Sequence, residues 1–324
     1  GVSATRARWR AAGEARPSGY VLMLATVVVL NLVGLVMVLS ASSVTAQDRY
    51  GSSWLFFQRH VVWSVLGVVA LATMSRLDYR LLRAATPALL IASSLLLVSV
   101  VIPGVGVSVS GASRWISLGP LRVQPSEFAK LALLLYAAQV LASRGDRLHD
   151  WRATLRPVLA VLGVFSLLVM LQPDLGTTIV LVMIAGTILF VGGAHIGHLA
   201  VVAAGSGVLG LLLGVAEPYR RARLTSFTNP WADPKGDGYQ VVQSLIALGS
   251  GGWTGTGPGA SKAKWLFLPN AHTDFIFAVI GEELGLLGCL LVLSMILAFL
   301  VLGVRTALRA PDRFGMLLAA GITG

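Results

Sequence analysis

Cysteine and charge are both scarce in this sequence of 324 residues. The one cysteine, Cys289, lies inside an apolar run, so the chain has neither an internal disulfide nor a zinc site built from cysteines. Charged residues make up 12% of positions and hydrophobic residues 56%. Soluble domains carry about twice that charged fraction. These absences exclude an ordinary soluble chain and indicate a protein that is solvated mainly by lipid.

Several recognisable patterns are also missing. The apolar runs are continuous rather than alternating, which favours spanning helices over a β-barrel. The glycine-rich segment 249–259 lacks the G-x-x-x-x-G-K-[ST] pattern, so it does not predict a nucleotide site. The first apolar run has no small-residue cleavage site at its end and is expected to be a retained helix rather than a signal peptide.

The apolar runs predict an all-α polytopic membrane bundle, because about 20 apolar residues suffice to span a bilayer. We expect a basic tail over residues 1–19 and a single transmembrane domain over 20–324, with a large polar segment at 216–273. A Gly/Ser-rich loop is expected over 103–124, and an amphipathic interfacial helix over 239–248. The predicted spanning helices cover approximately 20–44, 60–74, 84–102, 125–143, 155–171, 174–191, 196–215, 274–304, and 313 to the end at 324.

The net charge of +11 would suit a nucleic-acid partner, but Lys and Arg cluster at the ends of apolar runs. The positive-inside rule explains that clustering and places the N-terminus in the cytoplasm. The segment 216–273 is then outside, where the cluster of Arg220, Arg221 and Arg223 breaks the rule locally. Such a cluster suggests an anionic ligand, because arginine binds phosphate bidentately. Anchoring to lipid headgroups is the alternative.

Asp233 stands out within the outer segment. It lies in Asn229-Pro230-Trp231-Ala232-Asp233-Pro234, where the prolines stiffen the backbone and an aromatic ring is close in sequence. An apolar neighbour can raise the pKa of a carboxyl group toward the range of a general base. An ordinary Asp-Pro turn is the structural alternative.

Polar residues also mark the helix ends that this topology places on the outer face. Glu127 and Lys130 are three residues apart on one helix and are expected to pair, with a role in a site, together with Arg122, or a purely structural role. Asp174 is expected to cap the helix that it precedes, although a helix start also attracts anions. We expect these ends to gather beneath the long segment.

The helix expected at 274–304 carries the remaining polar groups. His272 and Asp274 lie at its start, where capping competes with metal ligation. Glu282 and Glu283 lie within the helix and need a basic partner, such as Lys130 or an arginine. Three glycines at 281, 285 and 288 predict close helix packing.

Motifs in the same order along nearly the whole chain resemble the SEDS family (shape, elongation, division and sporulation proteins) of bacteria. The cell-division branch is the more similar, ahead of the elongation branch. The family has ten membrane helices, so this sequence is expected to stop in the ninth. The matching stretches are residues 34–37, 40–42, 114–116, 124–130, 172–177, 229–234, 238–240, 243–244, 272–278 and 281–283.

The resemblance implies a peptidoglycan glycosyltransferase of the bacterial cytoplasmic membrane that acts on its outer face in septal wall synthesis. Such an enzyme moves an undecaprenyl-pyrophosphate-linked strand onto the GlcNAc 4-hydroxyl of lipid II with inversion. Asp233 matches the essential loop aspartate, in the role of base. The resemblance assigns substrate contacts to Arg114, Arg122, Glu127, Lys130, Asp174, Arg220, Arg221, Arg223, Tyr239, Gln240, Gln243, Ser244, His272 and Asp274.

The implied partners are a class B penicillin-binding protein, which is a transpeptidase, and other divisome membrane proteins. No cofactor is required by the pattern, and no dedicated metal-ligand set is evident, although a divalent cation (Mg²⁺ or Mn²⁺) is compatible with it. A lipid II flippase and a non-catalytic divisome scaffold are the alternatives. A transporter is expected to carry ionisable groups near the midplane and repeated halves, and neither feature is clear in this sequence.

Overall fold

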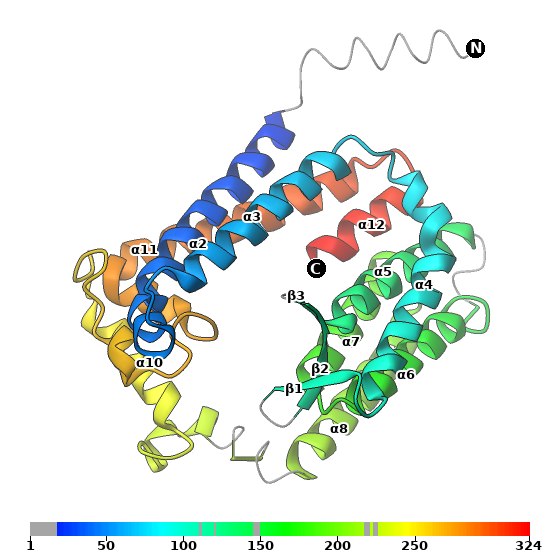
Figure 1. The fold of residues 1–324 in the computed structure, drawn as a ribbon. Helices are drawn as coiled ribbons and strands as arrows, with labels where there is room; N and C mark the ends of the chain where they lie inside the picture. The colour runs from blue at the N-terminus through cyan, green and yellow to red at the C-terminus, as the bar shows by residue number, and fades with distance from the viewer. Residues whose placement is uncertain (1–17, 110–111, 120, 145–149, 217–220, 223–225) are drawn as a thin grey trace. The chain divides into compact units, whose positions relative to one another are not determined.

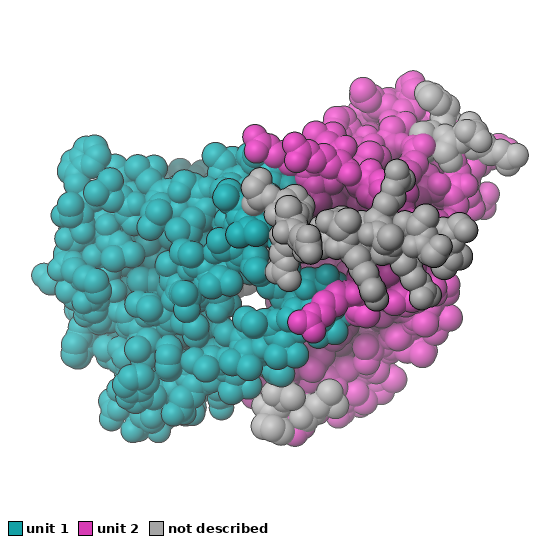
Figure 2. Space-filling model, turned by 90° about the horizontal axis from the view of Figure 1, so that it is seen from above, with its two compact units in different colours: residues 1–75, 217–302 teal, residues 76–216, 303–324 magenta. Residues whose placement is uncertain are grey.

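The computed structural model describes residues 18–109, 112–119, 121–144, 150–216, 221–222 and 226–324. The chain is predominantly helical, as predicted. It divides into two compact units, which Figure 2 colours separately and which are described here one at a time. Unit 1 comprises residues 1–75 and 217–302, and unit 2 comprises residues 76–216 and 303–324.

Unit 1 contains long helices and several short helical segments. Helix α2 pairs with α3, and η3 packs against both α2 and α10. Its elements are α2 (Ser18–Tyr50), α3 (Leu55–Met74), η2 (Pro230–Ala232), α10 (Tyr239–Ser250), η3 (Ala263–Phe267) and most of α11 (Ile276–Leu308). A small core at the α2–η3 contact contains Met37, Ala41, Ala263 and Leu268.

Unit 2 contains a bundle of helices and a small sheet. Helices α4, α5, α6 and α7 lie side by side, and α12 packs against α5 and α7 (Figure 1). The elements are α4 (Arg80–Val101), β1 (Gly106–Val109), β2 (Ala112–Leu118), β3 (Leu121–Val123), α5 (Pro125–Ser143), α6 (Leu155–Met170), α7 (Leu175–Val191), α8 (Ile196–Ala216) and α12 (Arg313–Thr323).

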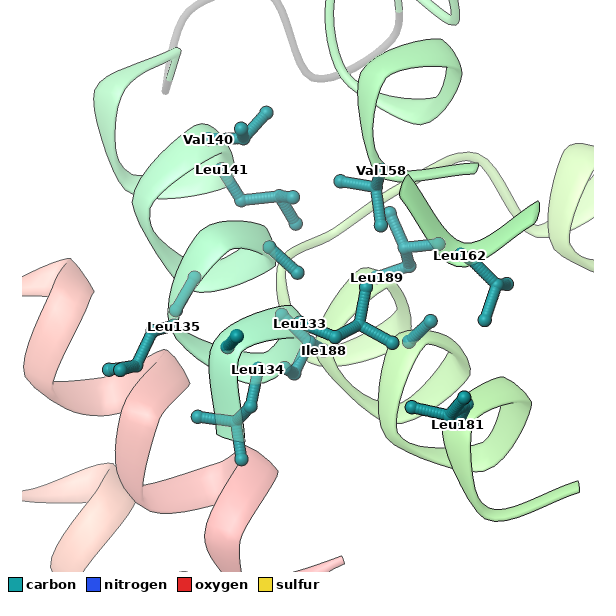
Figure 3. Close-up of a cluster of buried hydrophobic side chains, with 14 of the residues drawn as sticks. Leu133, Leu134, Leu135, Val140, Leu141, Val158, Leu162, Leu181, Ile188 and Leu189 are labelled. Carbon is teal, nitrogen blue, oxygen red and sulfur yellow. The ribbon is translucent and has the colours of Figure 1, made fainter. Parts of the chain in front are cut away.

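Helix α5 is the centre of unit 2, because it contacts α4, α6, α7 and α12. Apolar residues pack around most of it, and Leu133, Leu135 and Leu141 are fully buried (Figure 3). Between helices in lipid the hydrophobic effect supplies little attraction, so close van der Waals packing must hold them together. Alanines at 129, 132, 137 and 138, all completely buried, permit that close approach.

Five described helices are long and apolar enough to cross a membrane, namely α2, α3, α4, α8 and α11. The apolar helices α6, α7 and α12 are shorter. Most predicted boundaries are confirmed to within a few residues. Helix α2, however, continues to Tyr50, six residues beyond the predicted end at Val44, because its polar last turns stay helical past the apolar run.

The segment 103–124 was expected to be a loop, and this prediction is wrong. It forms a three-stranded antiparallel sheet in the order β1-β2-β3, with Val107 opposite Trp115 and Ile116 opposite Val123. The strands are too short for a clear alternating pattern in the sequence. Packing of the sheet on α4 and α5 stabilises it instead. Gly106 is required where the sheet meets α4, because a Cβ there would lie 2.7 Å from the carbonyl oxygen of Val100.

Candidate functional site

Asp233 lies at the end of the single 3₁₀ turn η2, in an exposed turn of unit 1. Its Oδ1 accepts the N–H of Gly236 at 3.0 Å, and its Oδ2 accepts the N–H of Asp237 at 3.2 Å. The backbone N–H of Gly238 closes the turn by donating to the carbonyl of Asp233 at 3.0 Å. Both the turn predicted for this segment and a fixed, solvent-accessible carboxylate are therefore present.

Two glycines make this turn possible. A Cβ at Gly236 would lie 2.0 Å from Oδ2 of Asp233, and a Cβ at Gly238 would lie 2.1 Å from the carbonyl oxygen of Pro230. A larger residue at Gly236 would displace the carboxylate, and one at Gly238 would displace the backbone of the turn. The apolar cover expected from Trp231 is not found, because Trp231 is 60% exposed and Asp233 is exposed as well. That expectation was wrong because proximity in sequence does not fold the ring over the carboxylate.

Helix α10 follows the Asp233 turn and confirms the predicted helix at 239–248. The side chains of Tyr239, Gln240 and Gln243 are partly buried. Ser244, predicted to lie opposite the apolar face, is instead buried beside Val242, and its hydroxyl donates to the carbonyl of Val241 at 2.8 Å. The helix thus turns Val242, Ser244 and Ala247 toward the protein, and Leu248 packs against the core of unit 1.

Leu245 and Ile246, on the same helix, are 46% and 50% exposed. Large exposed apolar residues on a short helix are typical of an interfacial element, and that assignment stays a prediction.

Two adjacent carboxylates, Glu282 and Glu283, form a buried polar cluster in unit 1. They are 3% and 1% exposed. Glu282 accepts the N–H groups of Lys262 at 2.8 Å and Ala263 at 3.2 Å, together with the hydroxyl of Ser261 at 2.5 Å. These donors lie at the start of η3, where the helical backbone leaves N–H groups without internal partners. Glu282 therefore binds the start of η3 to α11.

Glu283 is held by a different set of groups. Its Oε1 accepts the hydroxyl of Ser40 on α2 at 2.6 Å and the N–H of Ser261 at 3.3 Å, and it lies 3.6 Å from Nζ of Lys264. The lysine is also buried, and its ammonium donates to the carbonyl of Gly259. Because a buried charge is costly without a partner, the pair fixes the loop, α2 and α11 to one another.

The two glutamates were expected to need a basic partner, such as Lys130 or an arginine. This prediction is confirmed for Glu283, whose basic partner is Lys264, and is wrong for Glu282, which accepts from neutral donors. Sequence reasoning missed Lys264 because it lies in a loop, Gly259–Leu268, that carries no regular pattern. A signal was present: Lys264 interrupts the apolar run Ala263-Lys264-Trp265-Leu266-Phe267, and a cation within an apolar run needs an anion nearby.

The backbone of the glycine-rich loop is joined to α11 where that helix is interrupted. Gly285 has φ of 67° and ψ of −167°, so the helix breaks there. The N–H groups of Thr256 and Gly257 donate to the carbonyls of Glu282 and Glu283 at 2.9 and 3.1 Å. In return, the N–H groups of Leu286 and Leu287 donate to the carbonyls of Gly252 and Trp253 at 2.9 and 3.2 Å. The loop thus satisfies the groups that the break frees.

Glycines make this exchange sterically possible. A Cβ at Gly251 would lie 1.9 Å from the carbonyl oxygen of Gly281, and a Cβ at Gly255 would lie 2.1 Å from that of Glu283. The close packing predicted from glycines 281, 285 and 288 is therefore real at 281 and 285, but the packed element is a loop rather than another spanning helix.

His272 lies just before α11 and packs its ring on Phe56, with 4.7 Å between ring centroids. Burial, and secondly the positive charge of Arg49, lower the pKa of His272, while Asp274 acts in the opposite direction. The capping role expected here is not found, because α11 begins at Ile276 and no described hydrogen bond uses the exposed Asp274 carboxylate. The described residues contain no group of three or more His, Cys, Asp or Glu able to hold a metal ion.

In unit 2, Arg114 on β2 holds the turn between α6 and α7. Its guanidinium donates to the carbonyls of Gln172 at 3.2 Å and Pro173 at 2.5 Å, and its Nε lies 3.8 Å from Oδ2 of Asp174. These contacts join β2 to the turn between α6 and α7. Arg114 is thus occupied by protein groups.

Asp174 caps α7, as predicted. Its Oδ1 accepts the N–H of Thr177 at 3.1 Å, and its Oδ2 accepts the Thr177 hydroxyl at 2.9 Å. The carboxylate is largely buried, and these contacts leave it oriented by its own helix. The structure therefore gives Asp174 a structural function, and any role in ligand binding stays a prediction.

Glu127 and Lys130 form the predicted ion pair on the first turns of α5, with 2.8 Å between Oε1 and Nζ. The side chains are 57% and 26% exposed, so both remain accessible to a ligand. Arg122, on β3, is exposed as well. In the arginine cluster at 220–223, Arg221 is exposed and has a further interaction within the protein. Arg220 and Arg223 lie outside the described residues.

The predicted site residues are thus divided between the units. Unit 1 carries the Asp233 turn, α10 and His272, and unit 2 carries Arg122, Lys130 and the Arg114–Asp174 contact. A combined site under the long segment stays a prediction. Chemically, unit 1 offers an accessible, oriented carboxylate that is able to accept a proton, and unit 2 offers accessible cations that are able to bind an anion.

Comparison with known proteins gives consistent relationships over nearly the whole chain. The family model described as "Cell cycle protein", for FtsW, RodA and SpoVE, matches residues 20–324. Stage V sporulation protein E of Bacillus subtilis (strain 168) is 40% identical over 303 residues, covering 93% of this chain and 82% of that protein. A Nitrosococcus halophilus (strain Nc4) protein named "Probable peptidoglycan glycosyltransferase FtsW" is 40% identical over 317 residues, covering 97% and 81%.

Solved structures agree with these relationships. A chain from "Structural coordination of polymerization and crosslinking by a peptidoglycan synthase complex" gives a TM-score of 0.71 at 31% identity, covering 93% of this chain and 82% of that chain. The crystal structure of Thermus thermophilus Rod shape determining protein RodA gives 0.64 at 27% identity, covering 93% and 79%. The chain is therefore a multi-pass membrane protein that belongs to the FtsW/RodA/SpoVE family, the SEDS family.

Proposed function

We propose that this protein is a peptidoglycan glycosyltransferase that polymerises glycan strands during septal cell-wall synthesis. The names of the FtsW relatives and the similarity to a chain of a peptidoglycan synthase complex support this assignment. The structural observation that carries it is the Asp233 turn, in which two backbone N–H groups orient an exposed carboxylate. A proton acceptor fixed in position and open to substrate is what glycosyl transfer to a hydroxyl requires.

In the proposed reaction, Asp233 accepts the proton of the GlcNAc 4-hydroxyl of lipid II. The oxygen attacks the anomeric carbon of MurNAc at the end of the growing strand, and a β-1,4 bond forms. The bond from that carbon to the pyrophosphate oxygen breaks, and undecaprenyl pyrophosphate leaves with the electron pair. Attack opposite to the leaving group inverts the α-linked donor.

Cations then stabilise the charge that develops on the leaving pyrophosphate. Arg122 and Lys130 suit this role because both are accessible, and the cluster at Arg220, Arg221 and Arg223 adds positive charge to the outer segment. A divalent cation bound mainly by substrate phosphate needs only one or two protein carboxylates, and Mg²⁺ or Mn²⁺ is compatible with this scheme.

The cellular setting follows from the same proposal. The protein lies in the bacterial cytoplasmic membrane with its N-terminus in the cytoplasm and its active site on the outer face. The similarity to a chain of a synthase complex that couples polymerization to crosslinking supports a class B penicillin-binding protein as partner. Other divisome membrane proteins complete the expected assembly.

The decisive experiment reconstitutes a full-length form with its transpeptidase partner and supplies lipid II. Asp233→Asn is expected to lower glycan polymerisation by about 100-fold or more, because an amide does not accept the hydroxyl proton. Asp237→Asn is the matched control, because it changes a neighbouring exposed carboxyl group and leaves its N–H bond to Asp233 in place. Undiminished polymer from Asp233→Asn contradicts the base assignment.

A second substitution tests the leaving-group role. Lys130→Ala is expected to reduce polymerisation by roughly tenfold or more while the protein still assembles with its partner, since stabilisation of the pyrophosphate is lost. Normal activity and normal assembly in this variant would make Lys130 purely structural. Transport of lipid II without polymerisation would favour the flippase, and full function of Asp233→Asn in division would favour the scaffold.

A further inference from the structure

The charges on α11 place a membrane boundary beside Glu283. Residues 284–304 are uncharged and lie between Glu283 and Arg305. A stretch of roughly 20 residues, at about 1.5 Å per residue, matches a hydrocarbon core of about 30 Å. The uncharged run of α2 is longer and continues to Gln47; within it, the hydroxyl of Ser40 donates to Glu283 at 2.6 Å. This hydrogen bond therefore lies at the boundary that the charges of α11 mark.

The loop that follows α10 is attached to the protein at this level. Its N–H groups at Thr256 and Gly257 bind the last carbonyls before the break in α11, and its carbonyls at Gly252 and Trp253 accept from Leu286 and Leu287. Leu286 and Leu287 belong to the uncharged stretch, so the bonded part of the loop lies at or just inside the boundary. Irregular backbone is tolerated at this depth when the protein satisfies its polar groups, as it does here.

The same loop exposes aromatic side chains around this level. Trp253 is 72% exposed, Trp265 61% and Phe267 57%. Trp253 is bonded through its carbonyl to Leu287, itself 56% exposed, so its position continues the exposed apolar surface of α11. Glu282 holds the start of η3, which carries Trp265 and Phe267, one turn away. Aromatic side chains are enriched at the level of lipid headgroups, where an apolar ring and a polar edge are both accommodated.

We propose that the segment 251–267, expected from sequence to be part of an aqueous loop, lies in the membrane interface as a re-entrant element. Trp253, Trp265 and Phe267 insert among the lipid headgroups and upper acyl chains, and the bilayer is their partner. The buried pair of Glu283 and Lys264 fastens this element to α2 and α11. This placement requires only that the chain spans a membrane and makes these contacts. It does not depend on the proposed glycosyl transfer.

Spin labels test the depth of this segment in the full chain, reconstituted in lipid nanodiscs. Cys289→Ala removes the one cysteine of this sequence. Single spin labels are then attached to cysteines introduced by Trp253→Cys or Phe267→Cys. Lys235→Cys, in the exposed Asp233 turn, is the aqueous reference, and Leu291→Cys, 52% exposed on α11, is the hydrocarbon reference. Collision rates with oxygen and with a water-soluble nickel chelate are measured at each position.

The proposal predicts that the oxygen-to-nickel ratio at positions 253 and 267 is several-fold above that at 235 and below that at 291. A ratio equal to the aqueous reference overturns it, as do low collision rates with both reagents, which would mean that protein covers these positions. A second measurement uses substitutions that keep an aromatic ring at each position. Brominated lipids are expected to quench more tryptophan fluorescence in the natural protein than in the double variant Trp253→Phe and Trp265→Phe. An equal loss of fluorescence in the two proteins overturns the proposal.

Discussion

The two units hold lysine–glutamate pairs in opposite environments. In unit 1, Lys264 and Glu283 are 8% and 1% exposed and lie 3.6 Å apart, with hydroxyl, N–H and carbonyl groups around them. In unit 2, Lys130 and Glu127 are 26% and 57% exposed and lie 2.8 Å apart on one helix. The shorter pair is the more accessible one. Distance therefore does not rank these pairs by importance to the fold; burial does.

The physical reason is the cost of removing one partner. An exposed pair contributes about 0–1 kcal/mol, because water replaces either partner readily. A buried pair that loses one member leaves an uncompensated charge, which costs about 3–5 kcal/mol. The Lys264 pair is thus suited to holding unit 1 together, and the Lys130 pair is suited to exchanging its partner for a ligand.

The largest expected effect is that of Lys264→Met. Removal of the ammonium leaves Glu283 buried without a cation, and we expect a loss of about 3–5 kcal/mol in the free energy of unfolding. Lys130→Met is the matched control and is expected to change stability by less than about 1 kcal/mol. Thermal unfolding of the detergent-solubilised protein measures both. Equal shifts in Tm for the two variants would remove the distinction between the pairs.

The next comparison separates steric contact from backbone strain in the loop that Lys264 holds. Gly255 and Gly257 have φ of 82° and 105°, so alanine is strained at both, by about 1–3 kcal/mol. Only at Gly255 does a Cβ also meet backbone, 2.1 Å from the carbonyl oxygen of Glu283, whereas at Gly257 nothing lies within 4 Å. Gly255→Ala is therefore expected to lower Tm well below that of Gly257→Ala. Matching Tm values would show that the loop does not depend on this close contact.

The smallest expected effect concerns His272, which is partly buried. Its folded-state pKa is lowered from 6.5, mainly by burial and secondly by Arg49. The unfolded chain then binds more protons between the lowered pKa and 6.5, so stability is complete above 6.5 and falls as pH decreases through that window. The Tm of the natural protein is expected to decline there.

His272→Phe supplies the control for this pH dependence, because it keeps a ring against Phe56 without a titrating group. The variant is expected to show a flatter dependence of Tm on pH over the same window. An equally steep decline in the variant would assign the effect to other groups.

Much of the fold was predictable because each spanning helix carries its own signal. The helix at 125–143 was placed with the boundaries that the structure shows, since Pro125 fixes its start and the apolar run fixes its length. Asp174 was correctly predicted as a cap, and Glu127 was correctly paired with Lys130, because both interactions join residues three apart. Local spacing alone decides contacts of this kind.

Contacts between distant segments were not predictable in the same way. Ser40 and Glu283 are 243 positions apart, and Lys264 reaches Glu283 through a loop without periodicity. The sheet at 106–123 depends on pairing between short strands. Arg114 is assigned to substrate by the resemblance, whereas in the structure it donates to the carbonyls of Gln172 and Pro173. In each case the contacting residues are brought together by the tertiary fold, so their spacing in the sequence does not predict the contact.

The sequence by itself determined the membrane class, the number and order of most helices, the family motifs and the position of Asp233 in a proline-flanked turn. Those properties follow from apolar length and from short-range geometry. Tertiary structure alone decided that Glu282 and Glu283 join a glycine-rich loop to a break in α11, and that Lys264 is the buried cation. A buried charge takes whichever partner three-dimensional packing brings within reach, and spacing along the chain does not record that choice.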